Sequence, residues 1–272
     1  MNVLFTKISR GVAIVVATLL FVSCASLSSS GVGRIKRYDI AGDVPASFDG
    51  ATVAFISDIH YPSKFTRKRL SKIVRKLHAL SPDILLLGGD YVTSNDYLAE
   101  LFDSLSGVST TYGTYAVLGN HERSRAQLVD SVAMLYGIRL LNDEAVAVGS
   151  GDTIYIAGVR NSFLVEETCS PSDAVADKGF TILVAHTPDY AQDVSANADV
   201  VLSGHTHGGQ VTLFGLYTPV KNTHYGTRFL RGKNYTDSGV PVITTNGVGT
   251  SRRKIRFGVP SEIVVLRLRR KE

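Results

Sequence analysis

Five short apolar runs limit the fold of this chain more than any other feature, because each ends in aspartate, asparagine or histidine. Apolar runs of this length, bounded by glycine or serine, are typical of buried strands that end in loops. In open α/β sheets, ligands bind just beyond the carboxyl ends of the strands. We therefore expect these polar side chains to meet in one site. The segments are Phe55–His60, Leu87–Asp90, Leu118–Glu122, Leu183–Pro188 and Ala198–Gln210.

The last of these segments contains the stretch Ser-Gly-His-Thr-His-Gly-Gly-Gln at residues 203–210. Neutral imidazole is a common metal ligand, and glycine allows the tight bend that brings both rings to neighbouring points. By themselves, His205 and His207 would fit an exposed polar loop equally well. The site becomes specific because four other strand ends carry side chains of the same kind.

The strand ends together offer carboxylate, amide oxygen and imidazole groups, a mixture that suits Mn, Fe or Zn better than Mg, which favours an all-oxygen shell. Seven such groups are more than one four-coordinate ion can use. Two ions about 3.5–4 Å apart form a clamp for in-line displacement at phosphorus. The sequence therefore predicts two divalent metal ions and a phosphoester substrate. The side chains that offer these seven groups are Asp58, His60, Asp90, Asn120, His186, His205 and His207.

The ordered pattern D-x-H, G-D, G-N-H-[DE], H and G-H-x-H resembles the calcineurin-like metallophosphoesterase superfamily over about residues 50–268. The resemblance implies an α/β fold, a four-layer α/β/β/α sandwich of two mixed β-sheets flanked by helices. It also implies that a hydroxide shared by two ions attacks phosphorus, and that His121 protonates the leaving oxygen unless it only orients the phosphate. By the same resemblance, Asp58, His60 and His207 hold one metal, Asn120, His186 and His205 hold the other, and Asp90 bridges them.

The run G-H-T-H-G-G-Q is also similar to that of membrane-associated phosphodiesterases in this superfamily, among them enzymes acting on the pyrophosphate of UDP-2,3-diacylglucosamine in lipid A synthesis. This likeness implies hydrolysis of a phosphodiester or pyrophosphate in a lipid-linked or UDP-acyl-sugar substrate. An export signal favours an envelope phosphoester instead, because nucleotide sugars are made in the cytoplasm. The alternative is a non-catalytic surface lipoprotein that uses the fold to bind a partner, and the complete ligand set argues against it.

The first 24 residues predict an export signal. Lys7 and Arg10 precede an apolar run at residues 11–22, which is shorter than the roughly 20 residues of an ordinary spanning helix. A charged start, an apolar stretch and small residues are typical of such signals. Phe-Val-Ser-Cys at residues 21–24 resembles a bacterial lipobox, with phenylalanine in place of leucine, so Cys24 would carry lipid; an uncleaved signal anchor is the alternative. Both predict an exported domain attached to the membrane on its extracytoplasmic side.

The rest of the chain predicts one domain. A length of 272 residues with 44% hydrophobic residues is enough for a single large core. The net charge of +5 is modest and no aromatic-interleaved basic patch occurs, so we expect no nucleic-acid partner. Cys169 lies in a polar stretch without a nearby histidine and is expected to be an inert loop residue. Residues 25–50 predict a tether and an edge segment, and residues 51–268 the phosphoesterase domain.

Strands and helices alternate from Ala51 to Tyr136, which predicts a parallel sheet with right-handed crossovers. The short strands that follow, separated by turn residues, suggest antiparallel pairing. They are expected at residues 139–141, 145–148 and 153–157.

An amphipathic helix is predicted for residues 66–80, with Thr66 as its cap and leucine and isoleucine facing the core. The other face of this helix carries many basic residues. This basic face is either exposed to solvent or in contact with anionic lipid headgroups. These residues are Arg67, Lys68, Arg69, Lys72, Arg75 and Lys76. A second basic group belongs either to solvated loops or to a phosphate site: His224, Arg228, Arg231, Lys233, Arg252, Arg253 and Lys254.

Overall fold

The computed structural model describes residues 33–62, 66–160, 162, 170–213, 217–252 and 255–271. The predictions for the export signal, Cys24, Cys169, Arg253 and Lys254 concern residues outside these ranges. Among the described residues, no helix has both the length and the apolar character needed to cross a membrane.

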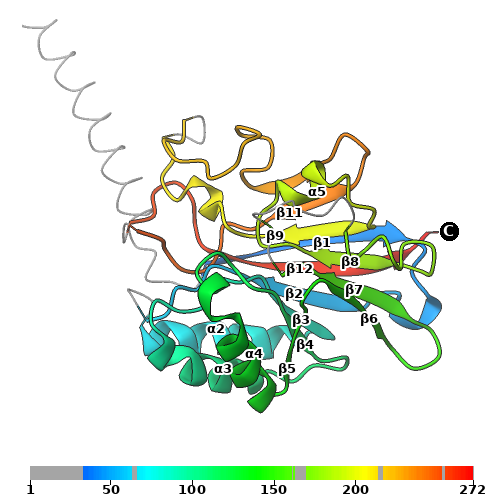
Figure 1. The fold of residues 1–272 in the computed structure, drawn as a ribbon, viewed down its shortest axis with the longest axis horizontal. Coiled ribbons are helices and arrows are strands. Elements are labelled where there is room, and N and C mark those ends of the chain that lie inside the picture. The colour runs from blue at the N-terminus through cyan, green and yellow to red at the C-terminus, as the bar shows by residue number, and fades with distance from the viewer. Residues whose placement is uncertain are drawn as a thin grey trace, which may run out of the picture.

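The first sheet has six strands in the order β1-β12-β2-β3-β4-β5 (Figure 1). The predicted strand–helix alternation forms its parallel part, from β2 to β5. β12 pairs with β2 in the antiparallel sense and β1 pairs with β12 in the parallel sense. The expected edge segment thus contributes a nine-residue edge strand to the sheet. The strands are β1 (Arg34–Gly42), β2 (Thr52–Ile56), β3 (Ile84–Leu87), β4 (Thr114–Ala116), β5 (Ile138–Leu140) and β12 (Glu262–Arg270).

The second sheet has the order β10-β11-β9-β8-β7-β6. β6 and β7 form the antiparallel hairpin expected after residue 137. The same expectation was wrong for β5, which pairs in parallel with β4, because helix α4 (Ala126–Leu135) crosses over and returns the chain to the edge where β4 starts. The strands are β6 (Glu144–Val148), β7 (Ile154–Gly158), β8 (Thr181–Val184), β9 (Val200–Ser203), β10 (Gly232–Tyr235) and β11 (Pro241–Thr244).

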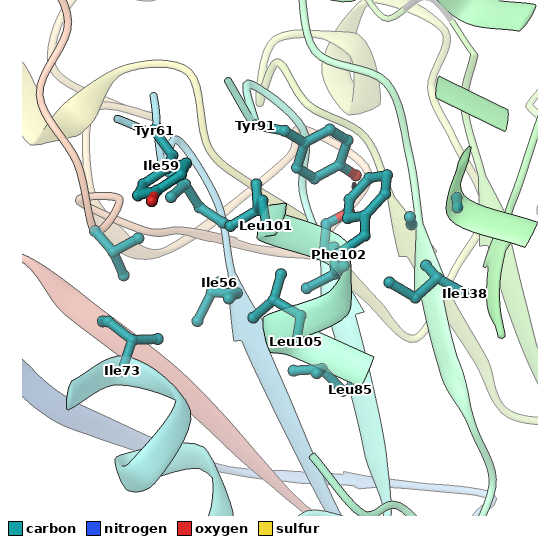
Figure 2. Packing of buried hydrophobic residues seen from close by; sticks show 14 of the residues in the cluster. Ile56, Ile59, Tyr61, Ile73, Leu85, Tyr91, Leu101, Phe102, Leu105 and Ile138 are labelled. Carbon is teal, nitrogen blue, oxygen red and sulfur yellow. Dashed lines mark hydrogen bonds between the residues drawn. The ribbon is translucent and has the colours of Figure 1, made fainter. Parts of the chain in front are cut away.

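Alternating apolar side chains bury both faces of the first sheet. One set, including Phe55 and Leu86, packs against the second sheet. The other set, including Ile56 and Leu85, packs against helices α2, α3 and α4, as Figure 2 shows for Ile73, Leu101, Phe102 and Leu105. The outer face of the second sheet is covered by α5 and by loop residues around Phe229. The result is the expected α/β/β/α order of layers, with a thin fourth layer.

The helices are α2 (Arg67–Leu80), α3 (Leu98–Ser106), α4 (Ala126–Leu135) and α5 (Tyr190–Asp193). Within the described ranges, 3-10 turns occur at Ala46–Phe48, Asn95–Tyr97, Arg123–Arg125 and His207–Gly209.

Helix α2 matches the prediction at its start, where the Thr66 side chain accepts a hydrogen bond from the Arg69 amide. The assignment of Arg69 to the basic outer face was wrong. Its side chain is 9% exposed, and it donates to the Val248 carbonyl at 2.7 Å and to Ser261 Oγ at 3.3 Å. A loop 179 residues further along the chain, which helical periodicity does not reveal, buries this guanidinium.

Candidate metal centre

The strand ends place their polar side chains through an unusual backbone conformation. Five of the seven predicted ligands have a positive φ: 57° at Asp58, 49° at His60, 56° at Asp90, 65° at His205 and 52° at His207. Left-handed conformations of residues other than glycine cost of order 1–3 kcal/mol each and persist where the surroundings enforce them, often at functional sites. Here they turn the chain sharply after β2, β3 and β9, so that side chains of three strands face one point.

Asp58, His60 and His207, the predicted ligands of one ion, lie directly beside one another. His60 Nε2 lies 3.2 Å from His207 Nε2, and His207 Nε2 lies 3.4 Å from Asp58 Oδ1. The ligand atoms of these three residues all lie within 4.8 Å of one another, and all three residues are buried. Two imidazoles and a carboxylate at this spacing fit one divalent ion of the kind that accepts mixed nitrogen and oxygen ligands.

Asp90 lies between this group and the second one. Its Oδ2 is 3.5 Å from His60 Nε2 and 3.5 Å from His186 Nε2. The ring of His186 lies 5.3 Å from that of His205, between centroids, and His205 Nδ1 lies 3.1 Å from Asn120 Oδ1. All seven predicted ligands are therefore brought together, with the Asp90 carboxylate in the middle. The donor set and the clustering of these side chains fit a centre of two ions.

A hydrogen bond to the backbone fixes the orientation of the His186 ring. Its Nδ1 donates to the Gly88 carbonyl at 2.6 Å, which leaves Nε2 directed at Asp90. A ligating histidine commonly gives its other ring N–H to a carbonyl in this way, which sets the tautomer and the ring plane. The end of β3 thus supplies both a ligand, Asp90, and the backbone group that orients a ligand from β8.

His121 occupies a different position from the seven. Its side chain is 42% exposed, and its Nε2 lies 3.9 Å from Asp90 Oδ2. Its backbone N–H donates to Asp90 Oδ1 at 3.0 Å, and its ring meets that of His60 edge-on at 4.9 Å between centroids. The ring therefore borders the centre and also faces solvent, as a group that contacts a substrate must. Its ring is also close enough to His60 and Asp90 to share a metal with them.

Burial makes most of the histidines neutral. It lowers the pKa of His60 to about 4 and that of His205 to about 3, and burial together with the nearby Arg256 cation holds the pKa of His207 well below its ordinary value. Only neutral imidazole can bind a metal. These three rings are therefore ready to act as ligands at neutral pH.

His186 and Asp90 behave as an ion pair in the metal-free chain. Burial works to lower the pKa of His186, but the Asp90 carboxylate outweighs it and raises that pKa to about 9. Burial works to raise the pKa of Asp90, yet the imidazoles of His186 and His60 hold it far below its ordinary value. The proton on His186 thus occupies the place that a metal would take.

Glu122 is a functional residue whose role the sequence did not reveal. It is fully buried, and its carboxylate accepts backbone N–H groups from Asp90 at 2.8 Å, Tyr91 at 3.1 Å and Gly119 at 3.0 Å. It therefore joins the loop after β3 to the loop after β4 and positions Asp90 relative to Asn120. The motif that contains Glu122 was recognised, but a buried carboxylate cannot be told from an exposed one in the sequence.

Arg256 is a second residue that the sequence reasoning missed. It is 2% exposed and donates to the Gly249 carbonyl at 2.6 Å and to the Asn246 carbonyl at 2.6 Å. It also donates to the carbonyl of His207 and, from Nη2, to Nδ1 of the same residue, both at 3.3 Å. A guanidinium only donates, so Nδ1 must accept, and Nε2 of His207 is the nitrogen left to face Asp58.

The loop held by Arg256 supports the first strand end. The Gly249 amide donates to the Asp58 carbonyl at 2.7 Å and the Val248 amide to the Ser57 carbonyl at 3.0 Å. A Cβ added at Gly247 would lie 2.7 Å from Cβ of Asp58. Residues 246–249 therefore press against the left-handed turn at Asp58, and Arg256 links this turn to His207.

A cavity of about 650 Å³ opens beside His205. Its walls come from the loops after β8 and β9 and include Thr187, Asp189, Lys221 and His224. Of the second group of basic residues, which the sequence assigned either to solvated loops or to a phosphate site, His224 lines this cavity. Arg228 instead pairs with Asp237 at 2.7 Å, and Lys233 lies over the ring of Tyr235, so these two are not part of the centre.

Comparisons with known proteins agree with this geometry. Residues 51–209 match the family model described as calcineurin-like phosphoesterase. An uncharacterized metallophosphoesterase of Aquifex aeolicus is 29% identical over 88% of this chain and 92% of its own length. The uncharacterized metallophosphoesterase YkuE of Bacillus subtilis is 27% identical over 83% of this chain and 82% of its own.

Phosphodiesterase YaeI of Escherichia coli is 29% identical, over 79% of this chain and 81% of its own length. The family match covers more than half of the chain and ends at the turn that carries His205 and His207, so it spans every predicted ligand. The chain belongs to the calcineurin-like phosphoesterase family and is a metal-dependent phosphoric ester hydrolase.

Proposed function

We propose that this chain hydrolyses phosphodiesters at a centre of two divalent metal ions and that it works while attached to a membrane, on its extracytoplasmic side. The observation that carries the chemistry is the meeting of seven ligand side chains from five strand ends around Asp90. Phosphodiesterase YaeI, a relative at 29% identity, supports a diester as the bond that is broken.

The residues divide into two groups around the shared carboxylate. Asp58, His60 and His207 would hold one ion, Asn120, His186 and His205 the other, and Asp90 would bridge them. Bound there, two divalent ions act as Lewis acids on the phosphoryl group and supply a nucleophile from water at neutral pH. Asp90 offsets the repulsion between two like charges held a few ångströms apart.

His121 is the proposed proton donor to the leaving oxygen. It borders the centre and faces solvent, with 42% of its side chain exposed. The cavity beside His205 gives room for the second substituent of a diester, which a phosphomonoester does not carry. We propose an envelope phosphodiester, lipid-linked in nature, as the substrate class; a UDP-acyl sugar is the rival.

The attachment of the domain depends on its first residues. A lipidated Cys24, or an uncleaved signal anchor, would hold it at the membrane. The Cys24→Ser substitution should then release the chain from membranes or leave an uncleaved precursor. Unchanged membrane retention, without lipid label on the wild-type chain, would favour the signal anchor.

The chemistry is tested with the full chain in detergent, supplied with Mn²⁺. Bis-p-nitrophenyl phosphate should be hydrolysed faster than p-nitrophenyl phosphate, and a UDP-linked acyl sugar tests the rival substrate. Asp90→Asn should lose metal and activity together, whereas Asp96→Asn, an exposed aspartate of the same sheet edge, should keep both. Hydrolysis by the wild-type chain that does not depend on added metal would contradict the proposal.

His121→Ala separates the proton donor from the ligands. It should keep two metals per chain, measured by plasma emission, while kcat falls about 10²–10⁴-fold for a diester with a poor leaving group. The loss should be smaller for p-nitrophenolate, which scarcely needs a proton. If a metal is lost, or if both substrates slow equally, His121 is a ligand or a positioning residue.

A further inference from the structure

The strand directions place several loops around the metal centre. β2, β3, β4, β8 and β9 all end there, and we call this edge of the two sheets the metal edge. β11 is parallel to β9 and so ends at the metal edge, whereas β12 is antiparallel to β2 and so begins there. The loop between β11 and β12 and the loop after β9 therefore both surround the centre.

Large apolar side chains are exposed on these two loops. The exposed fraction is 54% for Leu213, 65% for Tyr217, 53% for Val220 and 50% for Ile255. Leu213 and Tyr217 face each other in an antiparallel bridge, and a bridge between Val211 and Phe257 ties the two loops together. Val220 lines the cavity that contains His205. Exposed apolar side chains that lie together among polar residues mark protein or membrane interaction surfaces.

The same loops are rich in positive charge. Residues 204–231, between β9 and β10, contain three basic and no acidic residues, and residues 245–261, between β11 and β12, contain four basic and no acidic residues. Arg228 of the first loop pairs with Asp237, and Arg256 of the second is buried. Lys221 and Arg252 are exposed on them. α2 also starts at the metal edge, where Lys68 is exposed, and residues 66–82 contain six basic residues and none that is acidic. Exposed apolar side chains among cations are the combination that binds anionic membrane surfaces.

The chain also enters the fold at this edge. β1 is parallel to β12, so it begins where β12 begins, at the metal edge. The Gly33 amide donates to Ser261 Oγ at 3.1 Å, and Lys76 Nζ donates to the Gly33 carbonyl at 2.7 Å. Gly33, the first described residue, therefore lies at the metal edge and beside the basic face of α2.

We infer that the metal edge docks on an anionic lipid bilayer through Leu213, Tyr217, Val220 and Ile255, with Lys221 and Arg252 among the headgroups; we call these six residues the docking patch. The inference rests on the proposed function and deepens it. A docked metal edge turns the centre and its cavity toward the bilayer, so the substrate is a phosphoester that lies in the membrane surface.

The absence of tryptophan from the sequence allows a direct test. Tyr217→Trp places a single indole in the docking patch, and Leu213→Trp gives a second reporter on the facing side of the same bridge. Leu135→Trp is the matched control, because Leu135 is an apolar residue with 80% exposure at the end of α4, and α4 ends at the opposite edge of the sheet. Each full-length variant is reconstituted into vesicles that contain phosphatidylglycerol, and brominated lipids serve as quenchers.

The indoles at positions 213 and 217 should shift their emission to shorter wavelengths and be quenched, and the indole at position 135 should do neither. Neutralising the charges with Lys221→Gln and Arg252→Gln should weaken docking by about 25-fold, from about 1 kcal/mol per basic residue near an anionic surface. High salt or purely zwitterionic vesicles should also reduce the quenching.

Unquenched indoles at both patch positions, or equal quenching at position 135, would overturn the inference. An emission shift without vesicles that grows with protein concentration would assign the patch to a second copy of the chain instead. Hydrolysis of soluble bis-p-nitrophenyl phosphate by the wild-type chain, measured alongside, separates the two ideas. Its absence refutes the proposed function, whereas hydrolysis without quenching refutes only the docking patch.

Discussion

Replacing Arg256 by methionine should remove one of the two predicted metals before it unfolds the domain. Arg256 links His207 to the loop that supports Asp58, and these are two of the three proposed ligands of the first ion. Its hydrogen bonds go to His207 and to residues 246–259, on the side of the first ion. The first ion should therefore bind more weakly in this variant, and the second should bind as before.

The cost in stability follows from the groups that Arg256 satisfies. The buried carbonyls of Asn246 and Gly249 each accept a 2.6 Å hydrogen bond from it. An unsatisfied buried acceptor costs about 1–3 kcal/mol, so the two together cost about 2–6 kcal/mol. Relief from burying an unpaired charge offsets part of this loss. Since a domain is typically stable by about 5–15 kcal/mol, most of the variant should remain folded.

The assay combines three measurements on the same samples. Urea unfolding gives the stability, plasma emission gives the metals per chain, and calorimetric titration with Mn²⁺ gives the affinity of each site. Arg69→Met is the control: Arg69 is a buried arginine that donates to the same loop at Val248 but not to His207. It should lose stability and retain both metals. Two tightly bound metals in Arg256→Met would refute the reasoning, and so would the loss of both metals together.

Three other substitutions or conditions give independent tests. Glu122→Gln should cost about 1–3 kcal/mol in urea unfolding, because the new amide nitrogen faces a backbone N–H that needs an acceptor. Glu144→Gln, in the exposed ion pair with Arg139, should cost less than about 1 kcal/mol. Metal binding should release about one proton at neutral pH, because the pKa of His186 is raised to about 9 and its ring is charged below that pH. The affinity for metal should therefore rise about tenfold per pH unit up to about pH 9. Calorimetry in two buffers that shows no proton release would contradict this. Gly247→Ala should weaken the first site in the same titration, because the new methyl group lies 2.7 Å from Cβ of Asp58 and φ is 67°; unchanged affinity would mean that this loop does not position Asp58.

The sequence by itself predicted the order of layers and the seven polar side chains that the structure brings together. Hydrophobic periodicity is local, so β2, β3, β8 and β9 could be predicted from their own residues. The chemistry at their ends is local too, since each ligand directly follows its strand. The parallel pairing of β5 was missed because pairing direction depends on where α4 returns the chain, and short strands with turns between them look alike in either direction.

Only the tertiary structure decided which residues hold the ligands in place. Arg256 and His207 are 49 residues apart and Arg69 and Val248 are 179 apart, and a basic residue in a polar stretch carries no local sign that it is buried. Sequence reasoning therefore placed Arg69 on the basic outer face of α2 and passed over Arg256. Burial depends on how the sheets assemble, and so does the cost of leaving a buried charge or carbonyl unpaired. For this reason only the three-dimensional structure reveals that Arg256 and Arg69 hold the loops around the centre.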